Sequence, residues 1–70
     1  MTDRDVELDC PTPRFIETLR RLADALEQGQ SFRIQVGSAR FTIPADARLS
    51  IEHEASEGTE ELELQLTWKR

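Results

Sequence analysis

The last eleven residues of the chain alternate strictly between apolar and polar side chains. One parity holds Leu62, Leu64, Leu66 and Trp68, and the other holds Glu61, Glu63, Gln65, Thr67 and Lys69. A period of two is typical of a strand with one buried face and one face in water. The pattern therefore predicts a C-terminal strand, and the rest of the chain is interpreted around it.

Two β-hairpins are predicted from the same kind of alternation. The first has Phe32, Ile34 and Val36 before a Gly37-Ser38 turn, and Ala39, Phe41 and Ile43 after it. The second has Leu49, Ile51, His53 and Ala55 before a turn centred on Glu57-Gly58, and then the C-terminal strand. The turns place Phe32 opposite Ile43, Ile34 opposite Phe41, Leu49 opposite Leu66, Ile51 opposite Leu64, and His53 opposite Leu62. A slip of one residue would send every leucine to solvent, so this register is strongly specified.

A helix is predicted from Arg14 to Gln28. Its apolar stripe consists of Phe15, Ile16, Leu19, Leu22, Ala23 and Leu26, which recur at helical spacing. Thr12 is expected to cap the helix, with Pro13 at the first helical position, and Gly29 to end it in the left-handed conformation.

A short first strand is predicted for residues 5–10, ended by Pro11-Thr12-Pro13. The order is then β-α-β-β-β-β, an α+β fold in which four strands form one antiparallel meander under a single helix. The first strand could pair with either edge of that sheet. The expected core is Val6, Leu8, Phe15, Ile16, Leu19, Leu22, Leu26, Phe32, Ile34, Val36, Phe41, Ile43, Leu49, Ile51, Leu62, Leu64, Leu66 and Trp68.

Chain length and net charge limit which kinds of function are expected. Seventy residues indicate one small domain with a thin margin of stability, which a dimer or a host assembly would relieve. A formal net charge of −5 disfavours nucleic acid and anionic membranes as partners. Cys10 is the single cysteine, and no apolar run resembles a membrane span or a signal peptide, so a cytoplasmic location is expected.

An acidic patch is predicted on the second hairpin, where Glu52 faces Glu63 and Glu54 faces Glu61. If the strand 39–43 neighbours the strand 49–55, Arg40 falls beside Glu52 and offsets one charge. The patch is either a docking face for a basic partner or a divalent cation, or a solvated face that keeps the protein in solution. Opposed like charges are mildly destabilising in either case.

No catalytic set, metal site or cofactor site is predicted. His53 is interpreted as a part-buried or rim histidine, with a ligand or pH switch as the alternative. Cys10 is interpreted as a structural thiol, with a reactive thiol as the alternative. Trp68, placed near Ala47, either closes the core or anchors an interface. Arg33 and Arg40 are the other interface candidates.

Three stretches together resemble the amphi-Trp domain family of small prokaryotic proteins. They are the helix run 19–29, Ile43-Pro44-Ala45 followed by residues 49–54, and Glu-Leu-Glu-Leu-Gln-Leu-Thr-Trp at 61–68. The resemblance spans most of the chain, and its last stretch is the more specific one. The family has no assigned activity, so the resemblance implies no catalytic or binding residue.

The expected function is a non-enzymatic protein-interaction or assembly module. Its partner is an unknown protein or a second copy of the chain, which it would meet through a strand edge or the Trp68 rim. The alternative is a small-ligand or divalent-cation binding protein that uses Glu52, Glu54, Glu61 and Glu63.

Overall fold

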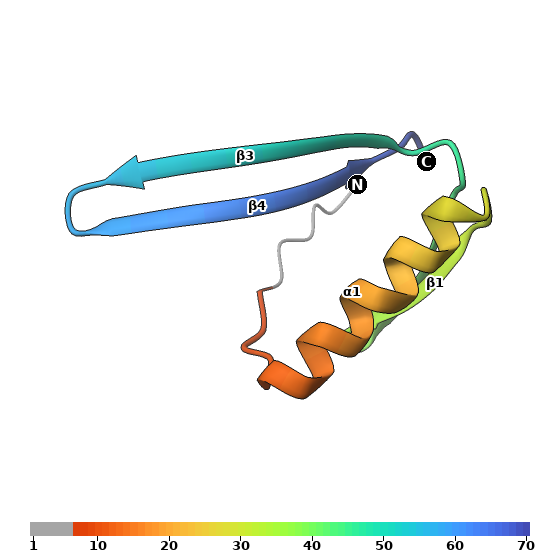
Figure 1. Ribbon diagram of the computed structural model, residues 1–70, viewed down its shortest axis with the longest axis horizontal. Helices are drawn as coiled ribbons and strands as arrows, with labels where there is room; N and C mark the ends of the chain where they lie inside the picture. Colours follow the sequence, from red (N-terminus) through yellow and green to blue (C-terminus); the bar gives the residue numbers. More distant parts are fainter. Residues whose placement is uncertain (1–6) are drawn as a thin grey trace.

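The computed structural model describes residues 7–70 (Figure 1). The elements are α1 (Thr12–Glu27), β1 (Phe32–Val36), β2 (Ala39–Ile43), β3 (Arg48–Ser56) and β4 (Thr59–Thr67). The strands form two separate two-stranded antiparallel sheets, β1–β2 and β3–β4. The α+β class is confirmed. The single four-stranded meander is wrong, because β2 and β3 are neighbours in the chain but belong to different sheets.

Both hairpins have the predicted register. Phe32 is opposite Ile43 in the first hairpin, and Ile51 is opposite Leu64 in the second. Gly37 and Gly58 lie in the turns with φ angles of 62° and 80°, a conformation that side chains with a Cβ rarely adopt. Turn chemistry and alternation are both local signals, and together they fix the pairing within each hairpin.

Helix α1 begins two residues earlier than expected. Pro11 occupies the N-cap position without a side-chain cap, so the predicted Thr12 cap is wrong, and Pro13 lies in the first turn. The Phe15 N–H donates to the Pro11 carbonyl at 3.0 Å, which supports this start. At the other end Gly29 has a φ of 66°, so the predicted left-handed stop is confirmed.

The predicted first strand is not present in the part of it that the structure describes. Residues 7–10 have no regular secondary structure, and Asp5 and Val6 lie outside the described residues. An edge strand needs a neighbour with free backbone groups, and these residues pair with neither sheet.

The chain divides into a body and an arm. We call α1 with the β1–β2 hairpin (residues 12–43) the body, and the β3–β4 hairpin (residues 48–67) the arm. Figure 1 shows the helix beside β1 and the arm projecting away from both. The arm strands have nine residues and the body strands five, so the arm spans about 30 Å against about 17 Å. The body therefore meets the base of the arm only.

The link between body and arm is short and constrained. It runs from Pro44 to Ala47, and the Ala47 N–H donates to the Pro44 carbonyl at 3.2 Å. Proline fixes its own φ and offers no N–H to continue a ladder. This turn sets the direction in which β3 leaves the body.

The core is much smaller than the sequence predicts. Among the described residues, Phe32 and Ile43 are buried, each with 7% of its surface exposed. Leu22, Ile34, Val36, Leu66 and Trp68 are half-buried. The expected burial is wrong for Leu8, Phe15, Ile16, Leu19, Leu26, Phe41, Leu49, Ile51, Leu62 and Leu64, which are exposed. One helix that packs beside one hairpin leaves no layer to cover the other hairpin.

Candidate functional site

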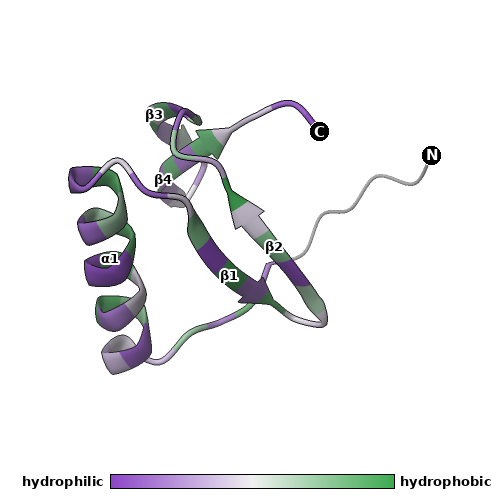
Figure 2. Ribbon diagram, turned by 90° about the vertical axis from the view of Figure 1, so that its right-hand side faces the viewer, coloured by the Kyte–Doolittle hydropathy of each residue, from purple (hydrophilic) through white to green (hydrophobic). Residues whose placement is uncertain are grey.

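The arm exposes its apolar face and shelters part of its polar face. Ile51 is 74% exposed and Leu62 is 71% exposed, and Leu49 and Leu64 on the same face are also more than half exposed. On the opposite face Ser50, Glu63 and Gln65 are half-buried. The hydropathy colouring in Figure 2 shows the mixture of apolar and polar residues in each element. This is the reverse of the burial expected for a finished sheet, so the apolar face of the arm is the first candidate surface.

Hydrogen bonds organise the polar face of the arm. The Gln65 side-chain amide donates to the Glu63 carboxylate at 2.8 Å and to the Glu52 carboxylate at 3.2 Å. The Ser50 hydroxyl donates to Gln65 Oε1 at 3.2 Å. One amide therefore bridges the facing pair Glu52 and Glu63, whose opposition across the strands is confirmed.

The other predicted acidic pair, Glu54 and Glu61, is also confirmed. Ligand oxygens of Glu54, Glu61 and Glu63 all lie within 4.8 Å of one another. A hydrogen bond with Glu63, then the negative charges of Glu63 and Glu54, raise the pKa of Glu61 above its ordinary value of 4.5. Like charges are held together here without an offsetting cation from the described residues.

Replacing Glu63 by glutamine is expected to lower the pKa of Glu61 toward 4.5 in the single chain. The substitution removes the negative charge that contributes most to the shift. Because the folded pKa is raised, the associated stability is present below pH 4.5 and is lost as pH rises through the raised pKa. An NMR pH titration of the Glu61 carboxyl at high dilution measures the change, with Glu57→Gln as the control. An unchanged Glu61 titration in Glu63→Gln would contradict this origin of the shift.

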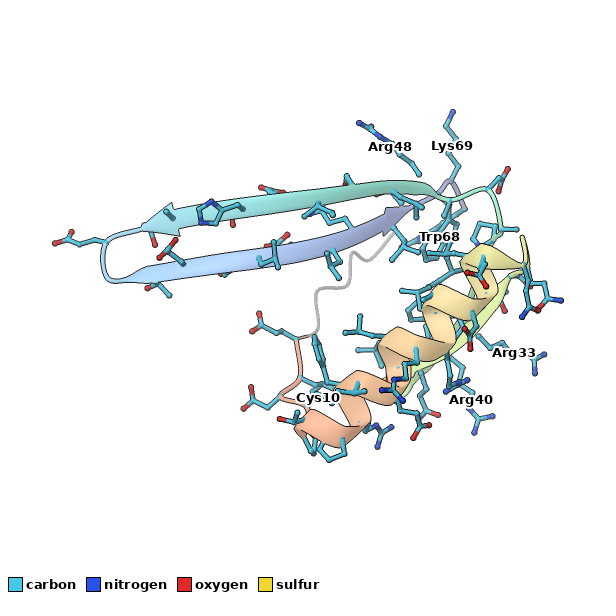
Figure 3. The ribbon with its side chains drawn as sticks, in the orientation of Figure 1. Cys10, Arg33, Arg40, Arg48, Trp68 and Lys69 are labelled. Carbon is cyan, nitrogen blue, oxygen red and sulfur yellow. The ribbon has the colours of Figure 1, made fainter. Side chains whose placement is uncertain are left out.

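Arg40 does not lie beside Glu52 as expected. The expectation required β2 and β3 to pair, and they do not. Arg40 instead donates from Nε to Gln35 Oε1 at 3.2 Å within the β1–β2 hairpin. Figure 3 shows Arg33 and Arg40 on the side of the body away from the arm. The two candidate interface arginines and the candidate acidic patch of the arm therefore lie on opposite sides of the chain.

A groove between the first half of α1 and the β1–β2 hairpin gathers positive charge. Four arginines line it, namely Arg14, Arg21, Arg33 and Arg40. The carboxylates of Asp9 and Glu17 and the apolar side chains of Leu8, Ile34 and Phe41 also line it. Sequence reasoning missed Arg14 and Arg21, which appear in the chain only as part of a polar helix face. Arg21 also lies over the Phe32 ring, with 5.3 Å from its Cζ atom to the ring centroid.

The arginines of the body have no acidic partner among the described residues. The carboxylate contact of a basic side chain in this part of the chain is on the arm, where His53 Nε2 and Glu60 Oε1 share a hydrogen bond of 3.0 Å. His53 is exposed, so of the two expected positions, part-buried or at the rim, the part-buried one is wrong. Cys10 is exposed and lines the groove. Among the described residues, the arginines of the body thus lack a carboxylate partner, and the glutamates of the arm other than Glu60 lack a basic one.

Trp68 closes the base of the arm. It is half-buried, and its ring lies 6.1 Å from the Phe41 ring, centroid to centroid, at an interplanar angle of 31°. This packing ties the end of β4 to β2, with Arg48 and Lys69 nearby at the arm base in Figure 3. Trp68 packs against the body only at the base of the arm, so the body does not bury the rest of the arm.

No family model, no characterised protein and no solved structure matches the chain. The resemblance to the amphi-Trp domain family therefore stays a prediction. No helix among residues 7–70 is long and apolar enough to cross a membrane. The described residues therefore combine an exposed apolar face on the arm with arginines on the body that have no carboxylate partner.

Proposed function

We propose that the protein is a non-enzymatic assembly module whose arm is covered by another polypeptide. The observation that carries the proposal is the exposed apolar face of the arm, formed by Leu49, Ile51, Leu62 and Leu64. A two-stranded hairpin with a bare apolar face is only marginally stable in water. A contiguous exposed apolar patch is also the usual mark of an interaction site.

The body supports the same proposal. Phe15, Ile16 and Leu19 of α1 are exposed together on neighbouring turns of the helix. A helix whose apolar side chains lie in water gains little from its own packing, because most helical stability comes from burying such a stripe. Covering the arm and the helix together would supply the burial that the single chain lacks.

The proposal is tested by dye binding and light scattering on the purified protein. A dye that fluoresces on exposed apolar surface should bind a monomer, whereas an associated chain should scatter with the mass of an assembly. The double variant Leu62→Ser/Leu64→Ser should weaken both signals clearly. Glu61→Gln/Glu63→Gln changes the opposite face of the same strand and should keep at least one of them.

The possible outcomes of these measurements either support or contradict the proposal. Either association or strong dye binding, clearly weakened by the two serines and kept by the two glutamines, supports an adhesive apolar face. A monomer that binds no dye, with a melting temperature unaffected by Leu62→Ser/Leu64→Ser, contradicts the proposal. Exposed substitutions of no consequence change stability by only about 0.5 kcal/mol or less.

A divalent-cation binding protein is the second candidate. One observation favours it: carboxylate oxygens of Glu54, Glu61 and Glu63 lie within 4.8 Å of one another. Oxygen ligands of this kind suit calcium or magnesium. Calorimetric titration with each ion would give heat for the wild type and none for Glu54→Gln/Glu61→Gln. The absence of heat and of any change in melting temperature in the wild type would end this candidate.

A further inference from the structure

We propose that the body carries a docking site of its own, separate from the apolar face of the arm, which takes an acidic segment of another protein as an added strand. The segment would lie in the arginine-lined groove, extended along the edge of β1 that β2 does not occupy. Three observations carry the proposal: the course of the groove, the edge of β1, and the charges on both sides of that edge. The proposal goes beyond the assembly function and does not depend on what covers the arm.

The groove follows the edge of β1. Its lining includes the consecutive residues Arg33, Ile34 and Gln35, whose side chains alternate between the two faces of the hairpin. A groove that reaches both faces of a strand must pass along one of its edges. Figure 2 shows α1 beside β1, with β2 on the far side of β1. Because α1 forms the other wall of the groove, the edge in question is the one that faces the helix.

No third strand pairs with β1 among the described residues. β1 is bonded to β2 alone, and in an antiparallel pair alternate residues direct their backbone N–H and C=O groups away from the partner strand. An extended peptide that adds to such an edge gains main-chain hydrogen bonds, while its side chains provide the specificity. The edge of β1 therefore favours an occupant in the extended conformation.

The polar face of the hairpin presents two guanidinium groups to an added strand. Arg33 lies on this face with Gln35, and Gln35 is opposite Arg40 on β2. The hydrogen bond from Arg40 Nε to Gln35 Oε1, at 3.2 Å, holds the Arg40 side chain across toward β1. Figure 3 shows Arg33 and Arg40 on the same side of the body. Carboxylates on one face of the added strand would meet this pair.

Two further guanidinium groups lie on the other side of the same edge. Arg21 lies over the ring of Phe32, which belongs to the apolar face of β1, and Arg14 is seven residues earlier on the same side of α1. Both line the groove. Successive side chains of a strand point to opposite faces, so an acidic strand along β1 would place carboxylates near both pairs of arginines.

The chain does not supply these carboxylates itself. Asp9 and Glu17 also line the groove, but among the described residues neither forms an ion pair with an arginine of the body. Residues 12–43 carry five arginines and three acidic side chains, a formal charge of +2, and no glutamate of the arm lines the groove. Arginines beside a strand edge repel a basic strand and attract an acidic one. The matching charges must therefore come from another protein.

The test uses a fluorescently labelled peptide of about eight glutamates, long enough to run along β1. Fluorescence anisotropy at low salt should show that the wild type binds it. Arg33→Glu/Arg40→Glu should bind at least about tenfold more weakly, because like charges then meet. Arg20→Glu/Arg48→Glu is the matched control, since it changes the net charge equally at residues that do not line the groove, and it should bind much as the wild type does. Circular dichroism shows that each variant is folded.

A second peptide tests the added strand itself. The same glutamate peptide, methylated on every backbone nitrogen, keeps its carboxylates but has no N–H to donate to β1. It should bind at least about tenfold more weakly than the unmodified peptide. Single-stranded DNA of equal charge should also bind more weakly, because it has no peptide backbone to pair with the strand edge.

The proposal is supported when the unmodified peptide binds and when both the groove variant and backbone methylation weaken it. A wild type that does not bind the peptide at millimolar concentration overturns it, and so does equal binding of the methylated peptide or the DNA. Peptide binding seen only in Glu7→Gln/Asp9→Asn would assign the groove to the N-terminal segment of the same chain, and would also overturn it. Leu62→Ser/Leu64→Ser should bind the peptide as the wild type does, so this test and that of the assembly function fail independently.

Discussion

Replacing Ile51 by glutamate is expected to lower the melting temperature by more than about 10 °C, although this side chain is 74% exposed in the single chain. When another polypeptide covers the arm, as proposed, the substitution removes a buried apolar side chain and puts a charge in its place, a loss of about 3 kcal/mol. For a domain of this size each kcal/mol corresponds to about 4–8 °C. Thermal unfolding followed by circular dichroism measures the effect.

Ile51→Val is the matched control, because it keeps the position apolar and should cost no more than about 1.5 kcal/mol. If the face were simply in water, glutamate at this position would change stability by about 0.5 kcal/mol or less. A melting temperature of Ile51→Glu within a few degrees of the wild type would therefore refute the burial of this face.

Replacing Phe32 by alanine is expected to unfold the body. Phe32 and Ile43, which face each other across β1 and β2, are the buried apolar side chains among the described residues. Removing a buried phenylalanine costs about 3–5 kcal/mol, close to the whole stability of a small domain. The loss of the Arg21 contact over the ring adds to the cost. Far-ultraviolet circular dichroism should show loss of the helix at 25 °C or a melting temperature lower by more than about 15 °C.

Phe32→Leu keeps an apolar side chain at this site and should retain the fold with a loss of about 1.5 kcal/mol or less. Both variants keep the site apolar, so their difference measures the effect of the volume removed. A folded Phe32→Ala protein with a nearly unchanged melting temperature would mean that stability lies elsewhere in the chain.

Local pattern was enough to predict each hairpin. The alternation around Gly37 and Gly58 fixes which residues face each other, and every predicted pair, including Glu54 with Glu61, is found in the structure. The helix was also predicted, apart from its first two residues, its N-cap and its last residue, which is Glu27 where Gln28 was expected. These features depend on the spacing of apolar, polar and turn residues within one short segment, and that spacing is read directly from the sequence.

The relation between the hairpins could not be predicted from the same pattern. A period of two shows that Ile51 and Leu64 share a face, but it does not say which surface covers that face. The expectation of one sheet assumed that β2 pairs with β3, and a proline-containing link of four residues sends β3 elsewhere. Apolar alternation is the same whether the cover comes from the same chain or from another.

The candidate site was predicted in part. Arg33, Arg40 and the four glutamates were identified from the sequence, whereas Arg14 and Arg21 became part of the groove only when α1 was placed beside the β1–β2 hairpin. Charged residues that are far apart in sequence form one surface only when the fold brings them together. The separation of an acidic arm from a net basic body follows from composition by segment, a signal that the whole-chain charge of −5 conceals.

The mass of the wild-type protein in solution tests the central claim most directly. Sedimentation equilibrium from nanomolar to high micromolar concentration should show a species heavier than the 8.0 kDa chain that dissociates on dilution. The melting temperature should fall in parallel, because association stabilises by mass action. A folded species of 8.0 kDa at every concentration, with a melting temperature independent of concentration and no binding of a dye for apolar surface, would contradict the account.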